Sequence, residues 1–334
     1  MTTKKNFLDL ADFSREEVLD LLALAHRLEA QPEPTALAGR ILGMVMFNPS
    51  LRTLSSFQAG MQRLGGTSFV IPPGQGTWQL ETRLGAVMNG AKAEHVREGI
   101  PVLALLLRRA RDPCVRGGTG PAGRHRRRGL PRDGGDGLEA GHQPGVGDQP
   151  SLPVARGLED ARRTRGAAAG KFVLSWVNHP RALPLAVPAA TVHMAAHRGM
   201  EVVVLRPEGF ALPPEIMDKA RAAAAASGGS LRETANREEA LAGAHVLYAK
   251  EWGSTAHYGD VDGDARLRGQ LGDWCVRGDW FAHTAPDCRF MHCLPVRRNV
   301  AVADEVLDGP HSVVLREAYN RLPAQMAVLH RLLA

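Results

Sequence analysis

The residue types best suited to hold a phosphate lie in residues 47–53, Phe-Asn-Pro-Ser-Leu-Arg-Thr. Apolar side chains then recur at steps of three and four up to a Gly-Gly pair: Leu51, Leu54, Phe57, Met61 and Leu64. An apolar run precedes the stretch, so the pattern predicts a strand that leads into a helix with Ser50, Arg52 and Thr53 in its first turn. The start of a helix attracts anions, and a guanidinium fits a phosphate. An ordinary Ser-capped helix with a surface Arg explains this segment equally well.

Polar clusters also follow apolar runs in the second half of the chain. They occupy residues 178–179 (Asn-His), 250–253 (Lys-Glu-Trp-Gly) and 293–299. If the apolar runs are parallel strands, their carboxyl ends meet at one edge of the sheet, where ligands of such sheets bind. We therefore expect these clusters to share one site.

Strands and helices alternate in the pattern that must position these clusters. A capping box at Ser14 and Glu17 opens a helix that reaches about Glu29. The expected strands are 41–47, 67–71, 172–177, 201–205, 245–249 and 289–293. The expected helices are 51–64, 182–198, 213–227, a short one capped by Asn236, and 318–333, with 304–307 and 312–315 continuing the alternation. This order predicts an α/β fold with mostly parallel sheets flanked by helices.

Composition bounds the function. The 334 residues are 44% hydrophobic and 23% charged, as in a soluble globular protein, and suffice for two domains. The first residues lack the apolar core of a signal peptide, and no apolar run is long enough to cross a bilayer. The four cysteines include no Cys-x-x-Cys pair, which favours reduced thiols in the cytoplasm and no metal site.

The excess positive charge belongs to one block, residues 108–166. This block holds 13 Arg and 13 Gly against 5 Asp and 2 Glu, so its surplus of six equals the net charge of the whole chain. It contains no Phe, Tyr or Trp and no periodic apolar face. Three interpretations are open: an RNA-binding Arg/Gly segment, a flexible linker, or a segment read in a shifted frame from GC-rich coding sequence.

Two motifs together resemble the aspartate/ornithine carbamoyltransferase family. They are residues 48–53 (Asn-Pro-Ser-Leu-Arg-Thr) and 292–300 (His-Cys-Leu-Pro-Val-Arg-Arg-Asn-Val). Trp78 after a glycine loop, residues 249–253 and residues 317–321 are most similar to the N-acetyl-L-ornithine branch of the family. The resemblance covers roughly residues 1–105 and 171–334.

The resemblance implies two α/β domains and a returning helix. Residues 1–150 would bind carbamoyl phosphate, residues 151–317 would bind the N-acylornithine, and residues 318–334 would cross back to the first domain. It also implies a cytoplasmic homotrimer with shared active sites, in which the loop that carries Trp78 reaches a neighbouring subunit. No organic cofactor, metal, membrane or nucleic acid is implied.

The resemblance also assigns roles to single residues. It implies three catalytic residues: Arg52, Thr53 and Cys293. Carbamoyl phosphate would be bound by the larger set Ser50, Leu51, Arg52, Thr53, Trp78, Cys293, Leu294 and Arg321. The acceptor would be bound by Lys250, Leu294 and Arg297. Cys293 would act through its backbone carbonyl and not as a nucleophile. Of Arg297 and Arg298, one is expected to face the site and the other to be solvated or paired.

The sequence departs from the family pattern in its middle. The family's His-Pro-x-Gln motif and a further phosphate-binding Arg should precede the second domain, where block 108–166 contains neither. His179-Pro180 follows a strand of the second domain and lacks the Gln. The block replaces the expected strands and helices at about equal length, which favours the frame-shift interpretation over an insertion.

The predicted reaction is transfer of a carbamoyl group to the δ-amine of N-acetylornithine in arginine biosynthesis. Leu54 stands where many relatives have Arg, and Ala93 and Pro184 lie in segments in which relatives recognise the acyl group and ornithine. N-succinylornithine and ornithine are therefore alternative acceptors. A catalytically impaired homologue whose Arg/Gly block binds polyanions is the other alternative.

Overall fold

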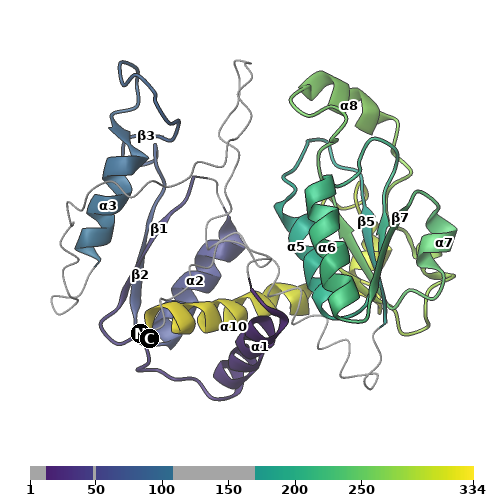
Figure 1. Cartoon of the computed structure of the whole chain (residues 1–334), viewed down its shortest axis with the longest axis horizontal. Helices are drawn as coiled ribbons and strands as arrows, with labels where there is room; N and C mark the ends of the chain where they lie inside the picture. The colour runs from purple at the N-terminus through teal and green to yellow at the C-terminus, as the bar shows by residue number, and fades with distance from the viewer. Residues whose placement is uncertain (1–12, 48–49, 108–169) are drawn as a thin grey trace.

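The computed structural model describes residues 13–47, 50–107 and 170–334. They form two α/β lobes connected by α1 (Arg15–Ala30) and α10 (Val314–Leu333), as Figure 1 shows. The two-domain α/β prediction is confirmed. The expectations for residues 108–166 lie outside the described residues, and so do Asn48 and Pro49 of the first motif.

The first lobe contains two short pairs of parallel strands. β1 (Ile41–Val45) pairs with β2 (Thr67–Ile71), and α2 (Leu51–Arg63) connects them. β3 (Leu80–Glu81) pairs with β4 (Glu94–His95), which leads into α3 (Val96–Leu106). The strand-to-helix junction predicted around the first motif is therefore present, and it aims the start of α2 beyond the carboxyl end of β1.

The second lobe is built on a five-stranded parallel sheet. Its spatial order is β7 (Ser230–Thr234), β6 (Glu201–Leu205), β5 (Lys171–Trp176), β8 (Val246–Lys250) and β9 (Arg289–Met291). All residues of β8 and all but the first of β5 are buried, as expected for central strands of a parallel sheet. The carboxyl ends of β8 and β9 consequently lie side by side.

Helices cover this sheet. α5 (Ala186–His197) and α6 (Pro214–Ala226) lie side by side in Figure 1 and pack on each other and on β5, β6 and β7. The remaining helical elements are α7 (Arg237–Leu241), α8 (Val261–Gly269), the 3₁₀ helix η2 (Gly278–Phe281) and α9 (Asp304–Leu307). Among residues 13–47, 50–107 and 170–334, none of the helices combines the length and apolarity needed to span a bilayer.

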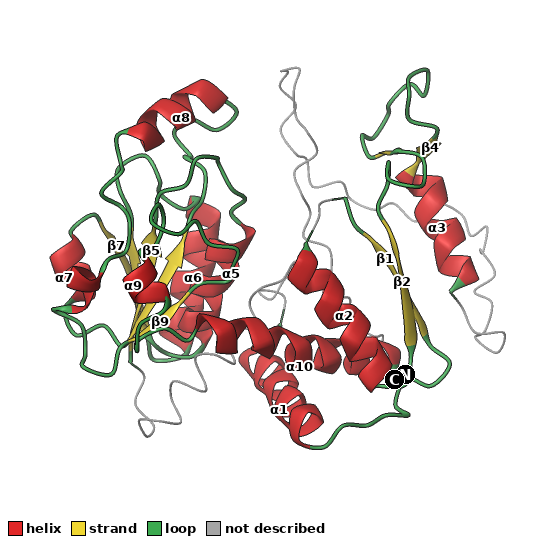
Figure 2. Cartoon of the chain, turned by 180° about the vertical axis from the view of Figure 1, so that it is seen from behind, coloured by secondary structure: helices red, strands yellow, loops and turns green. Residues whose placement is uncertain are grey.

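α1 and α10 belong to both lobes. The first-lobe core contains Met44, Phe57, Met61 and Leu64, and the second-lobe core surrounds the five-stranded sheet. α1 and α10 each contribute side chains to both cores, and they pack on each other. Figure 2 shows α10 extending from the second lobe across α1 towards α2. Gly60 permits the close approach of α2 and α10, because a Cβ there would lie 3.2 Å from Cγ of Met326.

Several elements differ from the sequence-based expectation. Leu51 was assigned to the inner face of α2, but it is 75% exposed. The helix expected from residue 182 begins at Ala186, and the helix expected from residue 318 begins at Val314. β7 and α8 were not predicted. By contrast, the capping box at Ser14 and the strands 67–71 and 201–205 are confirmed.

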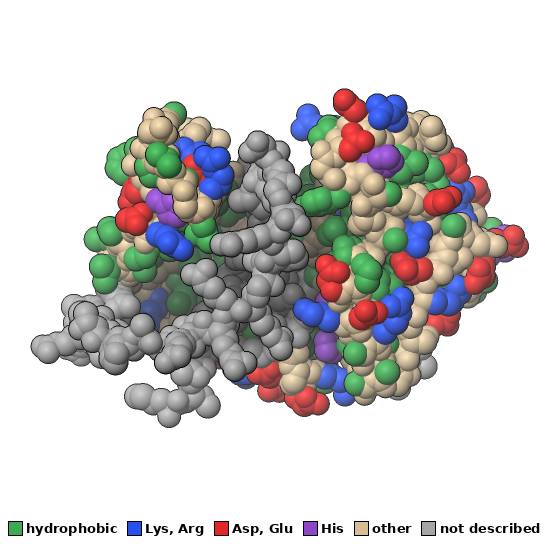
Figure 3. Space-filling model, turned by 45° about the horizontal axis from the view of Figure 1, so that its top comes forward, with side chains coloured by type: hydrophobic (Ala, Val, Ile, Leu, Met, Phe, Trp, Pro, Cys, Tyr) green, Lys and Arg blue, Asp and Glu red, His purple; other side chains and the backbone are tan. Residues whose placement is uncertain are grey.

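The surface of the second lobe carries no single-sign charge field in the view of Figure 3. Acidic and basic side chains are interspersed over it. This agrees with the sequence, in which the positive surplus is confined to residues 108–166.

Candidate active site

The first turn of α2 presents hydroxyl groups and a cation. Ser50 is the N-cap residue, yet its side chain caps no backbone N–H group. Its Oγ instead donates to Oγ1 of Thr53, 2.8 Å away. The first turn contains no acidic residue. The helix start therefore keeps its positive potential for an anion.

Arg321 brings a second cation to this helix start from the far end of the chain. Its Nη1 donates to Oγ1 of Thr53 at 3.2 Å, across 268 positions of sequence. Thr53 is only 2% exposed. Because its oxygen accepts from both Ser50 and Arg321, the hydroxyl proton of Thr53 is left to donate to another acceptor.

Electrostatic interactions place Cys293 with these cations. Burial lowers the pKa of Arg52, the charge of Arg321 lowers it further, and Cys293 acts in the opposite direction. Arg321 in turn acts on the pKa of Cys293. Two neighbouring guanidinium groups repel each other, and an anion between them relieves that repulsion. The first-lobe helix start and the turn after β9 therefore lie within electrostatic range of each other.

The carboxyl ends of β8 and β9 supply an ammonium group, a carboxylate and an imidazole. Lys250 ends β8, and its Nζ lies 3.2 Å from Oε1 of Glu251. Oε2 of Glu251 lies 3.2 Å from Nε2 of His292, just after β9. Nδ1 of His292 accepts from the backbone N–H of Leu294 at 3.0 Å. Direct contacts thus join these groups in one series, from Lys250 to the backbone N–H of Leu294.

Cys293 has the character of a neutral thiol. Burial raises its pKa, and the nearby carboxylates Glu317 and Glu251 add to the effect against the charge of Lys250. A thiol held protonated is a poor nucleophile. This agrees with the expectation that Cys293 is not a nucleophile, and its backbone role stays a prediction.

The carboxyl of Glu317, which raises the pKa of Cys293, is itself buried. Oε1 of Glu317 accepts from the hydroxyl of Tyr248 at 2.9 Å. Burial raises the pKa of Glu317 to about 7, although the Tyr248 hydrogen bond opposes this. Glu317 stands four residues before Arg321 on α10, so about one turn of helix links the second-lobe sheet to the cation that contacts Thr53.

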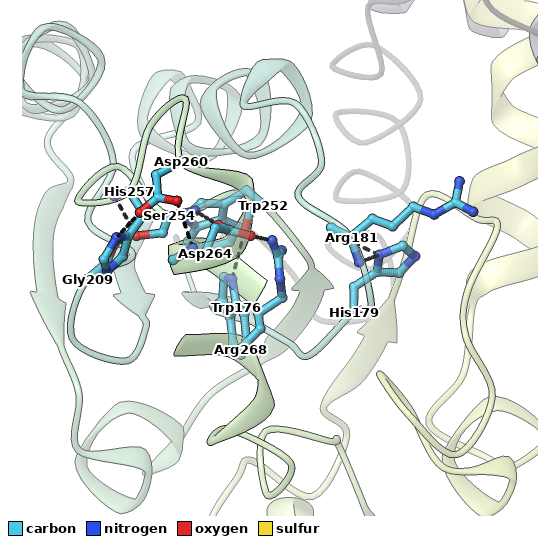
Figure 4. A network of polar contacts seen from close by, with 11 residues as sticks. Trp176, His179, Arg181, Gly209, Trp252, Ser254, His257, Asp260, Asp264 and Arg268 are labelled. Carbon is cyan, nitrogen blue, oxygen red and sulfur yellow. Dashed lines mark hydrogen bonds and ion pairs between the residues drawn. The ribbon is translucent and has the colours of Figure 1, made fainter. Parts of the chain in front are cut away.

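The segment after Glu251 is held by a further network. Nε1 of Trp176 donates to the carbonyl of Trp252 at 3.0 Å, and Nε1 of Trp252 donates to the carbonyl of Phe210 at 2.9 Å. Asp264 accepts from the backbone N–H of Ser254 and pairs with the buried Arg268. Figure 4 shows these groups pointing toward one another.

Three predicted residues stand apart from this cluster. Trp78 is 60% exposed, and its indole donates to Glu94 at 2.7 Å. The backbone of Leu51 belongs to the helix start, but its side chain points to solvent. Arg297 is exposed, whereas Arg298 pairs with Asp304 and Asp308. Arg298 is thus the paired member of the two.

Sequence reasoning gave no role to four residues of the cluster: Tyr248, Glu251, His292 and Glu317. A signal was present, since Glu251 and His292 are polar residues next to apolar strands that end at the same edge. The pairing of Tyr248 with Glu317 had none, because 69 positions separate them.

Potential metal ligands and the pocket of the second lobe both bear on the site. Within residues 13–47, 50–107 and 170–334, no three His, Cys, Asp or Glu side chains are grouped as metal ligands would be. A pocket of about 390 Å³ lies elsewhere in the second lobe, where Pro214, Met217 and Thr255 are among the residues that line it. None of the predicted site residues lines that pocket.

Comparison with known families gives two matches. Residues 5–107 match the family model described as aspartate/ornithine carbamoyltransferase, carbamoyl-P binding domain. Residues 187–332 match that of the Asp/Orn binding domain of the same family. The two matches fall on the two lobes.

Similar proteins include acylornithine enzymes. An N-acetylornithine carbamoyltransferase of Xanthomonas campestris is 33% identical, with 97% of this chain and 96% of that protein covered. An N-succinylornithine carbamoyltransferase of Bacteroides fragilis is also 33% identical, with 88% of this chain and 87% of that protein covered.

Solved structures of acetylornithine transcarbamylases are also similar to this chain. A structure of acetylornithine transcarbamylase complexed with acetylcitrulline superimposes with a TM-score of 0.82 at 29% identity and covers 99% of both chains. A variant of N-acetyl-L-ornithine transcarbamylase complexed with carbamyl phosphate and N-succinyl-L-norvaline gives a TM-score of 0.83 at 30% identity, covering 98% of this chain and 99% of that one.

Proposed function

Because the chain belongs to the aspartate/ornithine carbamoyltransferase family, we propose that it transfers a carbamoyl group to the δ-amine of N-acetylornithine. Carbamoyl phosphate is the donor, and N-acetylcitrulline and phosphate are the products, in arginine biosynthesis. The observation that carries the proposal is the contact of Arg321 with Thr53, which assembles two cations and two hydroxyls at one helix start.

Carbamoyl phosphate binds at this helix start. The backbone N–H groups of Ser50, Leu51, Arg52 and Thr53 and the guanidinium groups of Arg52 and Arg321 hold the phosphate. The hydroxyl proton of Thr53 points at the carbonyl oxygen of the carbamoyl group. This proposal is supported by the mutual repulsion of Arg52 and Arg321, which a bound dianion offsets.

The turn after β9 orients the carbamoyl group. The backbone carbonyls of Cys293 and Leu294 accept hydrogen bonds from the carbamoyl amide and so fix the reacting carbon. Leu294 has φ of 52°, an uncommon conformation for a residue with a branched side chain. Such a backbone turns its carbonyls in a direction that an ordinary strand does not offer.

The acceptor approaches from the second lobe. Lys250 and the exposed Arg297 bind the carboxylate and acyl oxygens of the acylornithine, and Leu294 contacts the acceptor beside them. The deprotonated δ-amine attacks the carbonyl carbon, forming a C–N bond. The C–O bond of the tetrahedral intermediate to phosphate then breaks, and the nitrogen transfers its proton to the departing phosphate. Catalysis consists of positioning and of stabilising the oxyanion by Arg52, Thr53 and Arg321.

The working enzyme is proposed to be a cytoplasmic homotrimer with shared sites. Trp78 is exposed on a loop whose position is fixed by the Glu94 hydrogen bond, so it is available to a neighbouring subunit. The domains remain as proposed from the sequence: 1–150, 151–317 and 318–334. The last of these boundaries falls inside α10, whose first turn still buries Val314 and Glu317 against the second lobe.

An assay of phosphate release from carbamoyl phosphate tests the proposal. The acceptors are N-acetylornithine, N-succinylornithine and ornithine, each at equal concentration. We expect turnover with N-acetylornithine and loss of turnover in Arg52→Ala. Turnover with ornithine alone overturns the acceptor assignment, and silence with all three overturns the proposed activity.

A further inference from the structure

Two buried side chains, Glu251 and His292, connect the predicted acceptor-binding Lys250 to the turn expected to hold the carbamoyl group. Nζ of Lys250 lies 3.2 Å from Oε1 of Glu251, and Oε2 of Glu251 lies 3.2 Å from Nε2 of His292. Nδ1 of His292 lies 3.0 Å from the backbone N of Leu294. Lys250 is 5%, Glu251 2% and His292 0% exposed. Water therefore competes little for these contacts.

The backbone contact fixes the protonation of His292. An amide N–H can only donate, so Nδ1 must be the unprotonated nitrogen of the imidazole. The proton lies on Nε2 and is donated to Glu251. Burial lowers the pKa of His292, and the facing charges of Lys250 and Arg52 act in the same direction against that of Glu251. The ring is neutral.

Glu251 is used by both neighbours at once. Burial opposes its ionisation, but the His292 hydrogen bond and the Lys250 charge outweigh burial and lower its pKa to about 2. Each carboxylate oxygen then has its own partner. A group that can only accept, with one oxygen for a cation and one for an N–H, matches a carboxylate and no other side chain.

This relay (Lys250, Glu251, His292 and the Leu294 N–H) is anchored differently on its Glu251 side and on its Leu294 side. Glu251 is followed by Trp252, whose carbonyl and indole are both hydrogen-bonded within the second lobe (Figure 4). Leu294 has φ of 52°, a conformation that persists only when its surroundings hold it. The ring of His292 supplies that support from the anchored side.

We propose that Glu251 and His292 are positioning residues that hold Lys250 and the Cys293–Leu294 turn in one fixed geometry. The δ-amine of the acceptor is thereby aligned with the carbonyl carbon of the carbamoyl group. The inference rests on the proposed carbamoyl transfer. Neither residue needs to touch a substrate. Each acts through the group it holds.

Two substitutions of His292 separate the two halves of the relay. The amide nitrogen of Gln reaches the place of Nε2, so His292→Gln keeps the Glu251 contact and loses the Leu294 contact. The oxygen of Asn reaches the place of Nδ1, so His292→Asn keeps the Leu294 contact and loses the Glu251 contact. We expect His292→Gln to lower kcat on the order of tenfold and His292→Asn to raise the KM for N-acetylornithine by a similar factor.

Glu251→Gln is the matched change at the centre. If its amide oxygen accepts from His292, its NH₂ group faces Lys250, and if it is reversed, it forces a proton onto Nδ1 opposite the Leu294 N–H. Either orientation loses one contact. We expect a KM for N-acetylornithine at least tenfold higher. Glu215→Gln, an exposed carboxylate at the start of α6, is the control and should change neither constant.

Nitrogen-15 NMR of the histidine rings gives a readout that needs no activity. The relay predicts a neutral Nε2–H tautomer for His292 from about pH 5 to 8, assigned by its loss in His292→Asn. An Nδ1–H tautomer, or titration in that range, overturns the inference. So do kinetic constants within twofold of wild type in both His292→Gln and Glu251→Gln.

The two proposals fail separately. If the wild-type chain releases no phosphate with any acceptor, the proposed function is lost, and the tautomer alone decides whether the relay exists. If wild type turns over but the variants match it, the function stands and the relay does not. Wild-type-like urea midpoints would confirm that the variants are folded.

Discussion

The two lobes differ in how far they bury their own apolar surface. In the second lobe the central strands β5 and β8 are buried almost throughout, and the sheet is the centre of one large core. In the first lobe α3 buries none of its residues, and Ile100, Val102, Leu105 and Leu106 are exposed. The described first lobe thus relies on α1 and α10 for much of its core. Yet this lobe carries α2, whose first turn is proposed to hold the phosphate. The lobe with the smaller core of its own therefore holds the groups that need the most exact placement.

The largest expected effect is a matched pair of Leu→Ala changes. Leu174 on β5 is 0% exposed and Leu106 on α3 is 73% exposed. We expect Leu174→Ala to lower the free energy of unfolding by about 3 kcal/mol because it opens a cavity. Leu106→Ala should change it by less than about 0.5 kcal/mol. Urea denaturation measures both, and equal losses would mean that α3 is buried in the working protein.

The next effect concerns the buried Glu317, which α10 shares with the second lobe. Its pKa is raised by burial from 4.5 to about 7, so the folded state binds its proton more tightly than the unfolded state does. Stability from this group is present below about pH 4.5 and is lost as the pH rises through 7. Glu317→Gln removes the titration, so its stability relative to wild type should rise by roughly 3 kcal/mol between pH 4 and 8.

A pH series of urea denaturations measures this difference. Glu215→Gln, an exposed change, is the control and should follow wild type within about 0.5 kcal/mol at every pH. A constant offset between Glu317→Gln and wild type would show that the carboxyl does not change its protonation on folding.

A third test removes the contact that joins the lobes at the site. Arg321→Ala leaves Thr53 without its guanidinium partner and removes one of two cations. We expect kcat/KM for carbamoyl phosphate to fall on the order of 10- to 100-fold, with a smaller effect on the KM of the acceptor. Arg316→Ala, on the same helix, is the control because Arg316 pairs with Glu29 on α1. Similar losses in both variants would assign the effect to the helix and not to the site.

The smallest expected effect is a loss of stability on removing the cap of α1, and it tests whether α1 couples the two lobes. Ser14 caps this helix reciprocally with Glu17. Ser14→Ala should cost about 1 kcal/mol. Because α1 contributes to both cores, we expect one shifted unfolding transition by calorimetry. Two transitions, with only one of them shifted, would show that the lobes unfold independently.

Much of the second lobe could be predicted because its strands are apolar runs separated by helices. β7 was not predicted because it is an edge strand that contains the polar residues Arg232 and Glu233 and so forms no apolar run. α8 was not predicted for a related reason. The face it buries includes Asp264 and Arg268, which pair one turn apart, so no apolar period marks it.

The proximity of the polar residues at the ends of β8 and β9 could be predicted, but the contacts among them could not. Parallel strands end at one edge, which places Lys250 beside His292 and Cys293. Leu51 was assigned inward because its spacing fits the apolar face, but it is the first residue of α2 and has no preceding turn to pack beneath it. Arg321 and Thr53 meet only through the tertiary path of α10, which no local pattern contains.

The contact between Arg321 and Thr53 also has a consequence for synthesis of the protein. The ribosome delivers the two residues 268 positions apart, which at ordinary elongation rates is an interval of tens of seconds. Throughout that interval the nascent polypeptide has the hydroxyls and one guanidinium but lacks the other. Full affinity for an anion therefore arises only after Arg321 has been made and α10 has folded, and truncated products that lack it should bind the donor substrate more weakly.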